Sequence, residues 1–222
     1  MTSRSISRAT FLASLAAAAL LAAAPEALAA RNENAETYVQ RSAAGALQAL
    51  GDQSVSSAER QQTFYRLMSQ FADMPRIANF VLGRYAAPLR SDAALRAEWT
   101  RTFQDYAIAV YEDQLDAYSQ SVLRVISSTE RVAGSDVVVI SEMTPRGQSR
   151  PLRVQWRVLR SGEVWKVVDV SLIFESNEIW LAQQQQRDFL AALDRNNGDV
   201  RALMTHVRSQ TASMRQRIMA RR

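Results

Sequence analysis

The sequence predicts an α+β domain in which helices pack on the concave face of a curved, four-stranded antiparallel sheet. Three observations support this fold class. Apolar residues follow helical spacing up to about residue 119, alternate with period two between residues 122 and 172, and return to helical spacing after residue 176. Such a cone has an apolar interior, which is either filled by side chains or open to a ligand.

The first 29 residues have the pattern of a cleaved secretory signal peptide. Arg4 and Arg8 precede an uncharged run from residue 9 to residue 25, and the small-residue motif Ala27-Leu28-Ala29 follows. Cleavage is expected after Ala29 or Ala30. We therefore expect residues 30–222 to form a single exported domain with a basic helical C-terminal end.

Composition narrows the function classes. The chain has no cysteine, so a disulfide scaffold and thiolate chemistry are both excluded. The net charge is +5, and Lys166 is the only lysine among 27 basic residues. Arginine pairs well with phosphate and carboxylate groups, so the bias is compatible with anionic lipid headgroups, although genome composition is the favoured explanation of the bias. Arginines spread along an exported chain argue against a nucleic-acid partner.

Helices are expected first along the mature chain. Residues 33–50 form a helix that ends at Gly51, and Ser56 or Ser57 caps a second helix. Pro75 forces a break, after which a short helix runs to Gly83, and residues 85–90 are expected as a loop.

The longest helix is predicted from a cap at Ser91 to about Ser119. It has two apolar stripes, so we expect it to be buried on two sides. One stripe comprises Leu95, Trp99, Phe103, Tyr106 and Val110, and the other comprises Ile108, Tyr111, Leu115 and Tyr118.

The four predicted strands form a meander. Tight turns at Gly134-Ser135, at residues 145–147 and at Ser161-Gly162 separate them. The strands are expected at residues 122–132, 137–143, 152–159 and 164–172. Two helices then close the chain, one over residues 176–195 and one from Asp199 onward.

Catalytic constellations are scarce. His206 is the only histidine, there is no Gly-x-Ser-x-Gly motif, and no phosphate-binding glycine loop is present. Glu112 and Asp116 lie one helical turn apart, which a solvated helix face explains. We expect no catalytic residues, no metal and no cofactor.

A series of motifs resembles the MlaC family, also called the toluene-tolerance or Mla-pathway phospholipid-binding proteins. The series begins with Asp73 ahead of Val81-Leu82-Gly83 and ends with Arg187-Asp188-Phe189 and Leu203. Between them lie Phe103, Tyr111, Leu115 and Tyr118 of the long helix, then Trp165-Lys166-Val167 and Asp169-Val170. The family pattern after Asp169 is changed, because Phe174-Glu175-Ser176 replaces the usual Glu-Gly-Val-Ser.

The resemblance implies a fold related to nuclear transport factor 2 and the function of a periplasmic lipid carrier, not an enzyme. Acyl chains are expected inside the cone and the headgroup near solvent. The implied partners are an inner-membrane MCE-domain protein with its ABC transporter and an outer-membrane lipoprotein complex, and the carrier itself is expected to be a monomer. Two alternatives remain open: an exported interaction protein or enzyme built on the same cone, and a carrier of another apolar ligand such as a hopanoid.

Large side chains that converge on one region give the expected cavity. The candidate lipid-binding residues are Phe71, Ile77, Val81, Leu82, Tyr85, Phe103, Tyr106, Val110, Tyr111, Leu115, Val139, Val154, Trp156 and Val168. Arg84 and Arg90 are candidates for contact with the headgroup or a partner, or are ordinary loop charges. Asp169 is expected to be a structural hydrogen-bonding residue at the end of the sheet.

Overall fold

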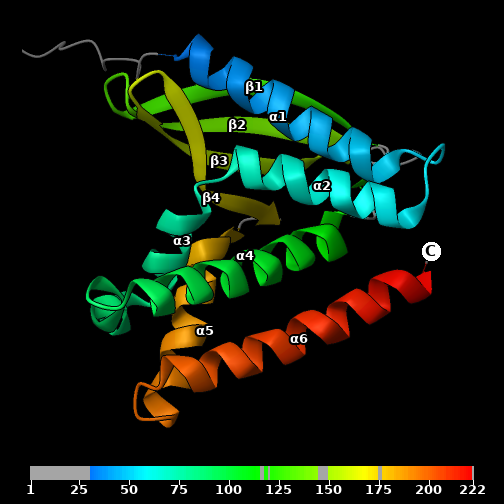
Figure 1. Ribbon diagram of the computed structural model, residues 1–222. Helices are drawn as coiled ribbons and strands as arrows, with labels where there is room; N and C mark the ends of the chain where they lie inside the picture. Colours follow the sequence, from blue (N-terminus) through cyan, green and yellow to red (C-terminus); the bar gives the residue numbers. More distant parts are fainter. Residues whose placement is uncertain (1–30, 116–117, 120, 145–149, 175–176, 222) are drawn as a thin grey trace, which may run out of the picture. The chain divides into compact units, whose positions relative to one another are not determined.

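The computed structural model describes residues 31–115, 118–119, 121–144, 150–174 and 177–221 (Figure 1). The expected signal peptide lies outside these residues. From Arg31 onward the chain forms one compact unit. Its helices are α1 (Glu33–Gly51), α2 (Ser57–Phe71), α3 (Met74–Val81), the 3₁₀ helix η1 (Gly83–Arg90), α4 (Ala93–Leu115), α5 (Leu181–Arg195) and α6 (Val200–Arg221). Its strands are β1 (Val122–Val132), β2 (Asp136–Thr144), β3 (Leu152–Ser161), β4 (Val164–Phe174) and β5 (Asn177–Trp180).

The described sheet is antiparallel, with the strand order β1-β2-β3-β4-β5. This confirms the α+β class and the meander, but the expected number of four strands is wrong. Residues 177–180, expected as the start of a helix, instead pair with the end of β4, where Ser171 lies opposite Trp180. Ile179 and Trp180 favour extended backbone, so the helix begins only at Leu181.

Helix boundaries follow identifiable caps. Ser56 forms a complete capping box with Glu59 at the start of α2, as one of the two expected caps. The expected cap Ser91 is wrong, because the Asp92 carboxylate accepts the Leu95 N–H at 2.8 Å and α4 begins at Ala93. The expected loop at residues 85–90 is also wrong, since these residues belong to η1.

The helices form layers on the sheet (Figure 1). Helix α1 lies against β1 and β2, α2 lies beside α1, and α4 follows on the side of α2 away from α1. Helix α6 runs along the outer side of α4, where Arg201 and Arg208 both pair with Glu98, at 3.1 and 2.8 Å. The apolar residues Leu203, Met204, Val207 and Ile218 of α6 are buried.

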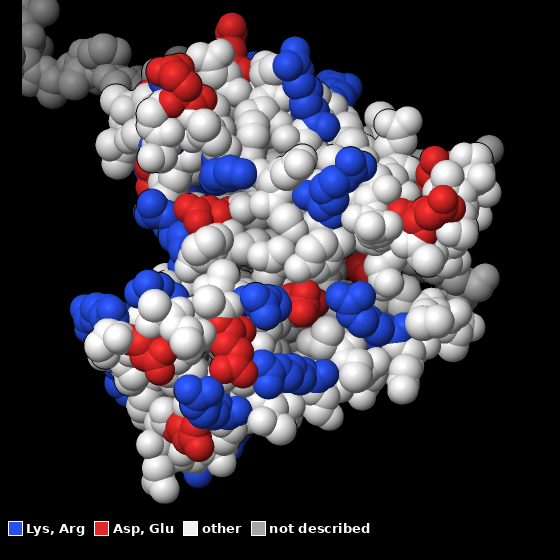
Figure 2. Space-filling model, viewed as in Figure 1, with Lys and Arg blue, Asp and Glu red and all other residues white. Residues whose placement is uncertain are grey.

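Basic and acidic side chains are interspersed over the face shown in Figure 2, so this face carries no large patch of one sign. Some of the arginines form ion pairs within the fold, as those of α6 do with Glu98. Within the described ranges, no helix is both long and apolar enough to span a bilayer.

The junction between α2 and α3 is anchored on β4. Ala72 forms a parallel bridge with Val167, and the Asp73 N–H donates to the Val167 carbonyl at 2.8 Å. The Lys166 ammonium donates to the Gln70 carbonyl at the end of α2. Asp73 also caps α3 by accepting the Arg76 N–H at 3.1 Å. Two parts of the motif series, Asp73 and Lys166-Val167, therefore meet at one junction.

Replacing Asp73 with Ala removes the cap of α3 and is expected to lower the free energy of unfolding by about 1 kcal/mol. Asp73→Asn keeps an acceptor oxygen and should retain most of that stability. Urea denaturation of both variants measures the difference. Equal stability of Asp73→Ala and the parent chain would show that α3 does not depend on this cap.

Candidate functional site

A largely apolar cavity of about 300 Å³ lies between the sheet and the helices that cover it. Its described lining consists of Ala43, Ala46, Leu47, Met68, Phe71, Ala72, Ile77, Tyr111, Gln114, Leu115, Tyr118, Met143, Leu152, Val154, Trp156, Val167, Asp169, Val170, Leu172 and Leu181. The volume falls at the lower end of the range for small-molecule sites. Helices α1, α2 and α4 and strands β2, β3 and β4 contribute most of the wall.

Small side chains on the helices leave this space. Ala43 and Ala46 lie one turn apart on α1, and Ala72 follows the end of α2. All three are buried, so the room that larger side chains would fill at these positions is part of the cavity.

Three aromatic rings form a continuous row, and two of them, Phe71 and Trp156, line the cavity. Ring centroids are 5.5 Å apart for Tyr38 and Phe71, and 5.6 Å apart for Phe71 and Trp156. The Trp156 indole N–H donates to Ser141 Oγ at 2.8 Å, and the Tyr38 hydroxyl donates to the Phe71 carbonyl at 2.7 Å. Because both polar atoms are satisfied within the protein, Phe71 and Trp156 present apolar ring surface to the cavity.

Half-buried residues mark the mouth. They are Tyr111, Leu115 and Tyr118 near the end of α4, Leu172 of β4 and Leu181 at the start of α5. Gln114, which is exposed, lies among them. The mouth thus joins an apolar interior to a rim with hydroxyl and amide groups.

Six of the fourteen candidate residues line the cavity in the structure. They are Phe71, Ile77, Tyr111, Leu115, Val154 and Trp156. The other eight lie outside its described lining: Val81, Leu82, Tyr85, Phe103, Tyr106, Val110, Val139 and Val168.

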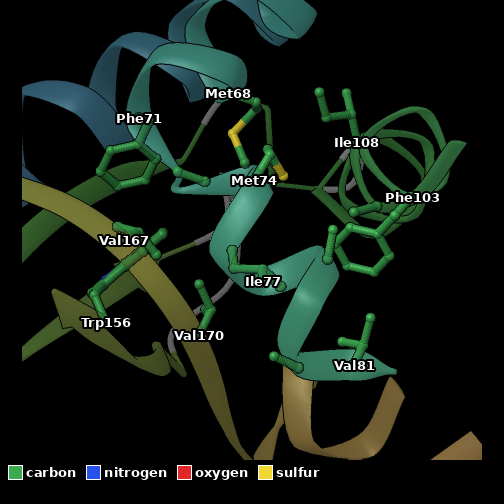
Figure 3. Packing of buried hydrophobic residues seen from close by; sticks show 14 of the residues in the cluster. Met68, Phe71, Met74, Ile77, Val81, Phe103, Ile108, Trp156, Val167 and Val170 are labelled. Atoms are coloured by element: carbon green, nitrogen blue, oxygen red, sulfur yellow. The ribbon is translucent and has the colours of Figure 1, made fainter. Parts of the chain in front are cut away.

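Helix α3 explains most of this division (Figure 3). Phe71, Trp156 and Val170 lie on the sheet side of α3, whereas Phe103 and Ile108 lie on its α4 side. There Phe103 and Tyr106 pack with Trp99 against Phe189 of α5, with centroids 5.7–6.3 Å from the Phe189 ring. The first stripe of α4 therefore builds a second aromatic core, and the second stripe reaches the cavity.

A bulge in β4 shifts the alternation that placed Val168 in the cavity. Arg157 pairs with Asp169 but its neighbour Val158 pairs with Val167, so Val168 is the extra residue. Val167 and Val170 line the cavity instead. Val139 is fully buried on β2 beside Trp156, but does not reach the cavity.

Several lining residues were absent from the sequence-based set. Ala43, Ala46 and Leu47 are spaced as one face of α1, and Met68 shares a stripe with Phe71 on α2. Helical periodicity could have found both groups. The helical spacing gave no reason to single out the alanines, because their small size becomes significant only once the cavity is known.

Arg84 and Arg90 lie away from the described lining. Arg84 pairs with Asp194 and lies over the Tyr85 ring, while Tyr85 donates its hydroxyl hydrogen bond to the same Asp194 carboxylate. These contacts join η1 to the end of α5. Arg90 is exposed at the end of η1.

Asp169 is both a structural residue and part of the cavity wall. Its side chain is buried, and Oδ1 accepts the N–H groups of Val170 at 2.8 Å and Ala182 at 2.9 Å. It thereby supplies a cap to α5, whose own N-cap residue Trp180 makes no side-chain cap bond. Burial raises the pKa of Asp169, although these two hydrogen bonds and nearby Arg157 act in the opposite direction.

Comparison with known proteins identifies the family. The family model for the MlaC protein matches residues 35–209, which include every described lining residue. The chain belongs to the MlaC family. No curated protein sequence matches it significantly.

A solved structure has the same MlaC-type fold. It is the phospholipid-binding protein of Ralstonia solanacearum, in complex with a phospholipid. The superposition has a TM-score of 0.67 at 20% identity and covers 81% of this chain and 98% of that one.

Replacing Asp169 with Ala leaves the N–H groups of Val170 and Ala182 without this acceptor and should cost about 1–2 kcal/mol of unfolding free energy. Asp169→Asn keeps an oxygen and should cost less. The pKa of Asp169 in the folded chain lies above the ordinary value of 3.8. As the pH rises from 3.8 through the folded pKa, the parent chain therefore loses stability relative to Asp169→Asn. Urea titrations across this pH range test both statements, and a parallel pH profile for parent and Asn variant would contradict the second.

Proposed function

We propose that this chain is a periplasmic phospholipid carrier that holds an acyl chain in its cavity and moves lipid between membranes. The observation that carries the proposal is an apolar cavity with hydroxyl and amide groups at its rim, in a member of the MlaC family. The Ralstonia solanacearum protein with the same fold, solved with a phospholipid, supports the choice of ligand.

Burial of a hydrocarbon chain supplies the binding energy. Each methylene group removed from water contributes about 0.8 kcal/mol, so a sixteen-carbon chain contributes on the order of 12 kcal/mol before ordering costs. Spontaneous release into water would then be slow. A carrier of this kind must hand its lipid over by direct contact with a membrane or a membrane protein.

The cavity, at about 300 Å³, has the size of a small-ligand site with room for hydrocarbon. The headgroup would remain at the rim, beside Gln114 and Tyr118. A filled interior, as the alternative of a pure interaction protein requires, does not agree with this cavity.

The lining suits binding better than acid-base catalysis, which needs a positioned donor and acceptor. Asp169 is the one carboxylate among the described lining residues, and its Oδ1 is occupied by backbone N–H groups. His206 lies on the exposed side of α6.

The transport system is proposed from the family resemblance. The chain would act as the soluble component of an ABC-type lipid transport system. It would exchange lipid with an inner-membrane MCE-domain protein and an outer-membrane lipoprotein complex. The signal peptide expected at residues 1–29 is the basis for placing it in the periplasm.

Native mass spectrometry of the mature protein, purified from a periplasmic extract without detergent, tests the function. A discrete bound mass that lipid extraction identifies as a phospholipid supports the proposal. A ligand-free mass, together with failure to take up added phospholipid, would contradict it.

Val154→Trp tests the cavity, because Val154 lines it and is only 1% exposed. The added ring volume competes with an acyl chain, so bound lipid should fall at least about tenfold while the fold persists. Val110→Trp is the matched control, since Val110 is half-buried and outside the described lining. The same mass spectra give both occupancies, and equal occupancy in the two folded variants would place the lipid elsewhere.

A further inference from the structure

Asp169 brings an acidic group to an otherwise largely apolar wall. Its exposed fraction is 6%, and the other polar residues of the described lining, Tyr111, Gln114 and Tyr118, are uncharged groups on or just after α4. The neighbouring residues of β4 in the wall, Val167 and Val170, are apolar.

The cap of α5 does not require this charge. A hydrogen-bond acceptor is sufficient to receive the N–H groups of Val170 and Ala182, and Asn or Ser provides one. Burial of a carboxylate has a free-energy cost that burial of an amide avoids. Capping of α5 therefore does not explain why residue 169 is a carboxylate rather than an amide or a hydroxyl.

No described cation pairs directly with Asp169. Arg157 lies opposite it in the sheet register, but the Arg157 guanidinium makes two hydrogen bonds to Asp136, at 3.1 and 2.8 Å. The remaining oxygen, Oδ2, receives no hydrogen bond from the described residues. Burial raises the pKa of the Tyr111 phenol, and the nearby Asp169 carboxylate raises it further. The phenol on this side of the cavity therefore stays protonated.

We propose that the Asp169 carboxylate makes the cavity selective for esterified acyl chains over free fatty acids. This inference rests on the proposed function, which it deepens. A negative charge on a low-dielectric wall repels a second negative charge inside the cavity, and has much less effect on a neutral ester.

The two ligand classes differ in where their charge lies. A fatty acid carries its carboxylate on the first carbon of the chain. In a phospholipid this position is a neutral ester, and the phosphate lies farther out beyond the glycerol. With the hydrocarbon equally deep, the fatty acid brings its anion closest to Asp169, whereas the phospholipid keeps its anion at the rim, where water screens it.

A ligand pair with the same tail tests the selectivity. Displacement of a fluorescent phospholipid from the mature chain, at mildly alkaline pH, gives the affinities of hexadecanoate and monohexadecanoylglycerol. The affinity ratio, ester over acid, should fall about tenfold in Asp169→Asn, mainly through tighter binding of hexadecanoate. Asp169→Ser, which also keeps an acceptor oxygen without charge, is the second variant if Asp169→Asn folds poorly.

Glu142→Gln is the matched control. Glu142 also carries a carboxylate on the sheet, but it pairs with Arg153 and lies outside the described lining, so the ratio should not change. An unchanged ratio in folded Asp169→Asn and Asp169→Ser would overturn the inference while leaving the carrier function intact. Failure of the fluorescent phospholipid to bind the parent chain would contradict the proposed function itself, and the inference with it.

Discussion

The attachment of helices to β4 is the constraint on which the rest of this structure depends. On one side, the Val167 carbonyl accepts the Asp73 N–H and the Lys166 ammonium binds the end of α2. On the other side, Asp169 accepts the N–H of Ala182 in the first turn of α5. These hydrogen bonds are short-ranged and directional, so they fix two walls of the cavity relative to one strand.

The aromatic part of the cavity wall is apolar because the polar atoms of its residues form hydrogen bonds within the protein. Trp156 and Tyr38 use their polar atoms within the protein, and the small alanines of α1 leave space that larger side chains would fill. Surfaces of this kind gain little from contact with water and much from contact with hydrocarbon. A ligand that fills the space therefore stabilises the folded chain, which couples occupancy to stability.

The sequence was sufficient for the fold class because strand and helix periods differ clearly, and β3 shows the alternation in full. It was insufficient where tertiary contacts decide. The spacing on α4 identified two buried stripes but not that α3 would separate them, which placed Phe103 and Tyr106 in the wrong group. One extra residue in β4 moved Val168 out of the cavity wall, and no local sequence pattern predicts such a bulge.

Asp169 ties the anchoring of α5 to the entrance of the cavity. The Ala182 N–H that it accepts belongs to the residue after Leu181, a half-buried residue of the mouth. An outward movement of this end of α5 would have to break that hydrogen bond and leave the buried carboxylate with one fewer donor. The hydrogen bond from Ala182 therefore holds the start of α5 against the wall of the cavity.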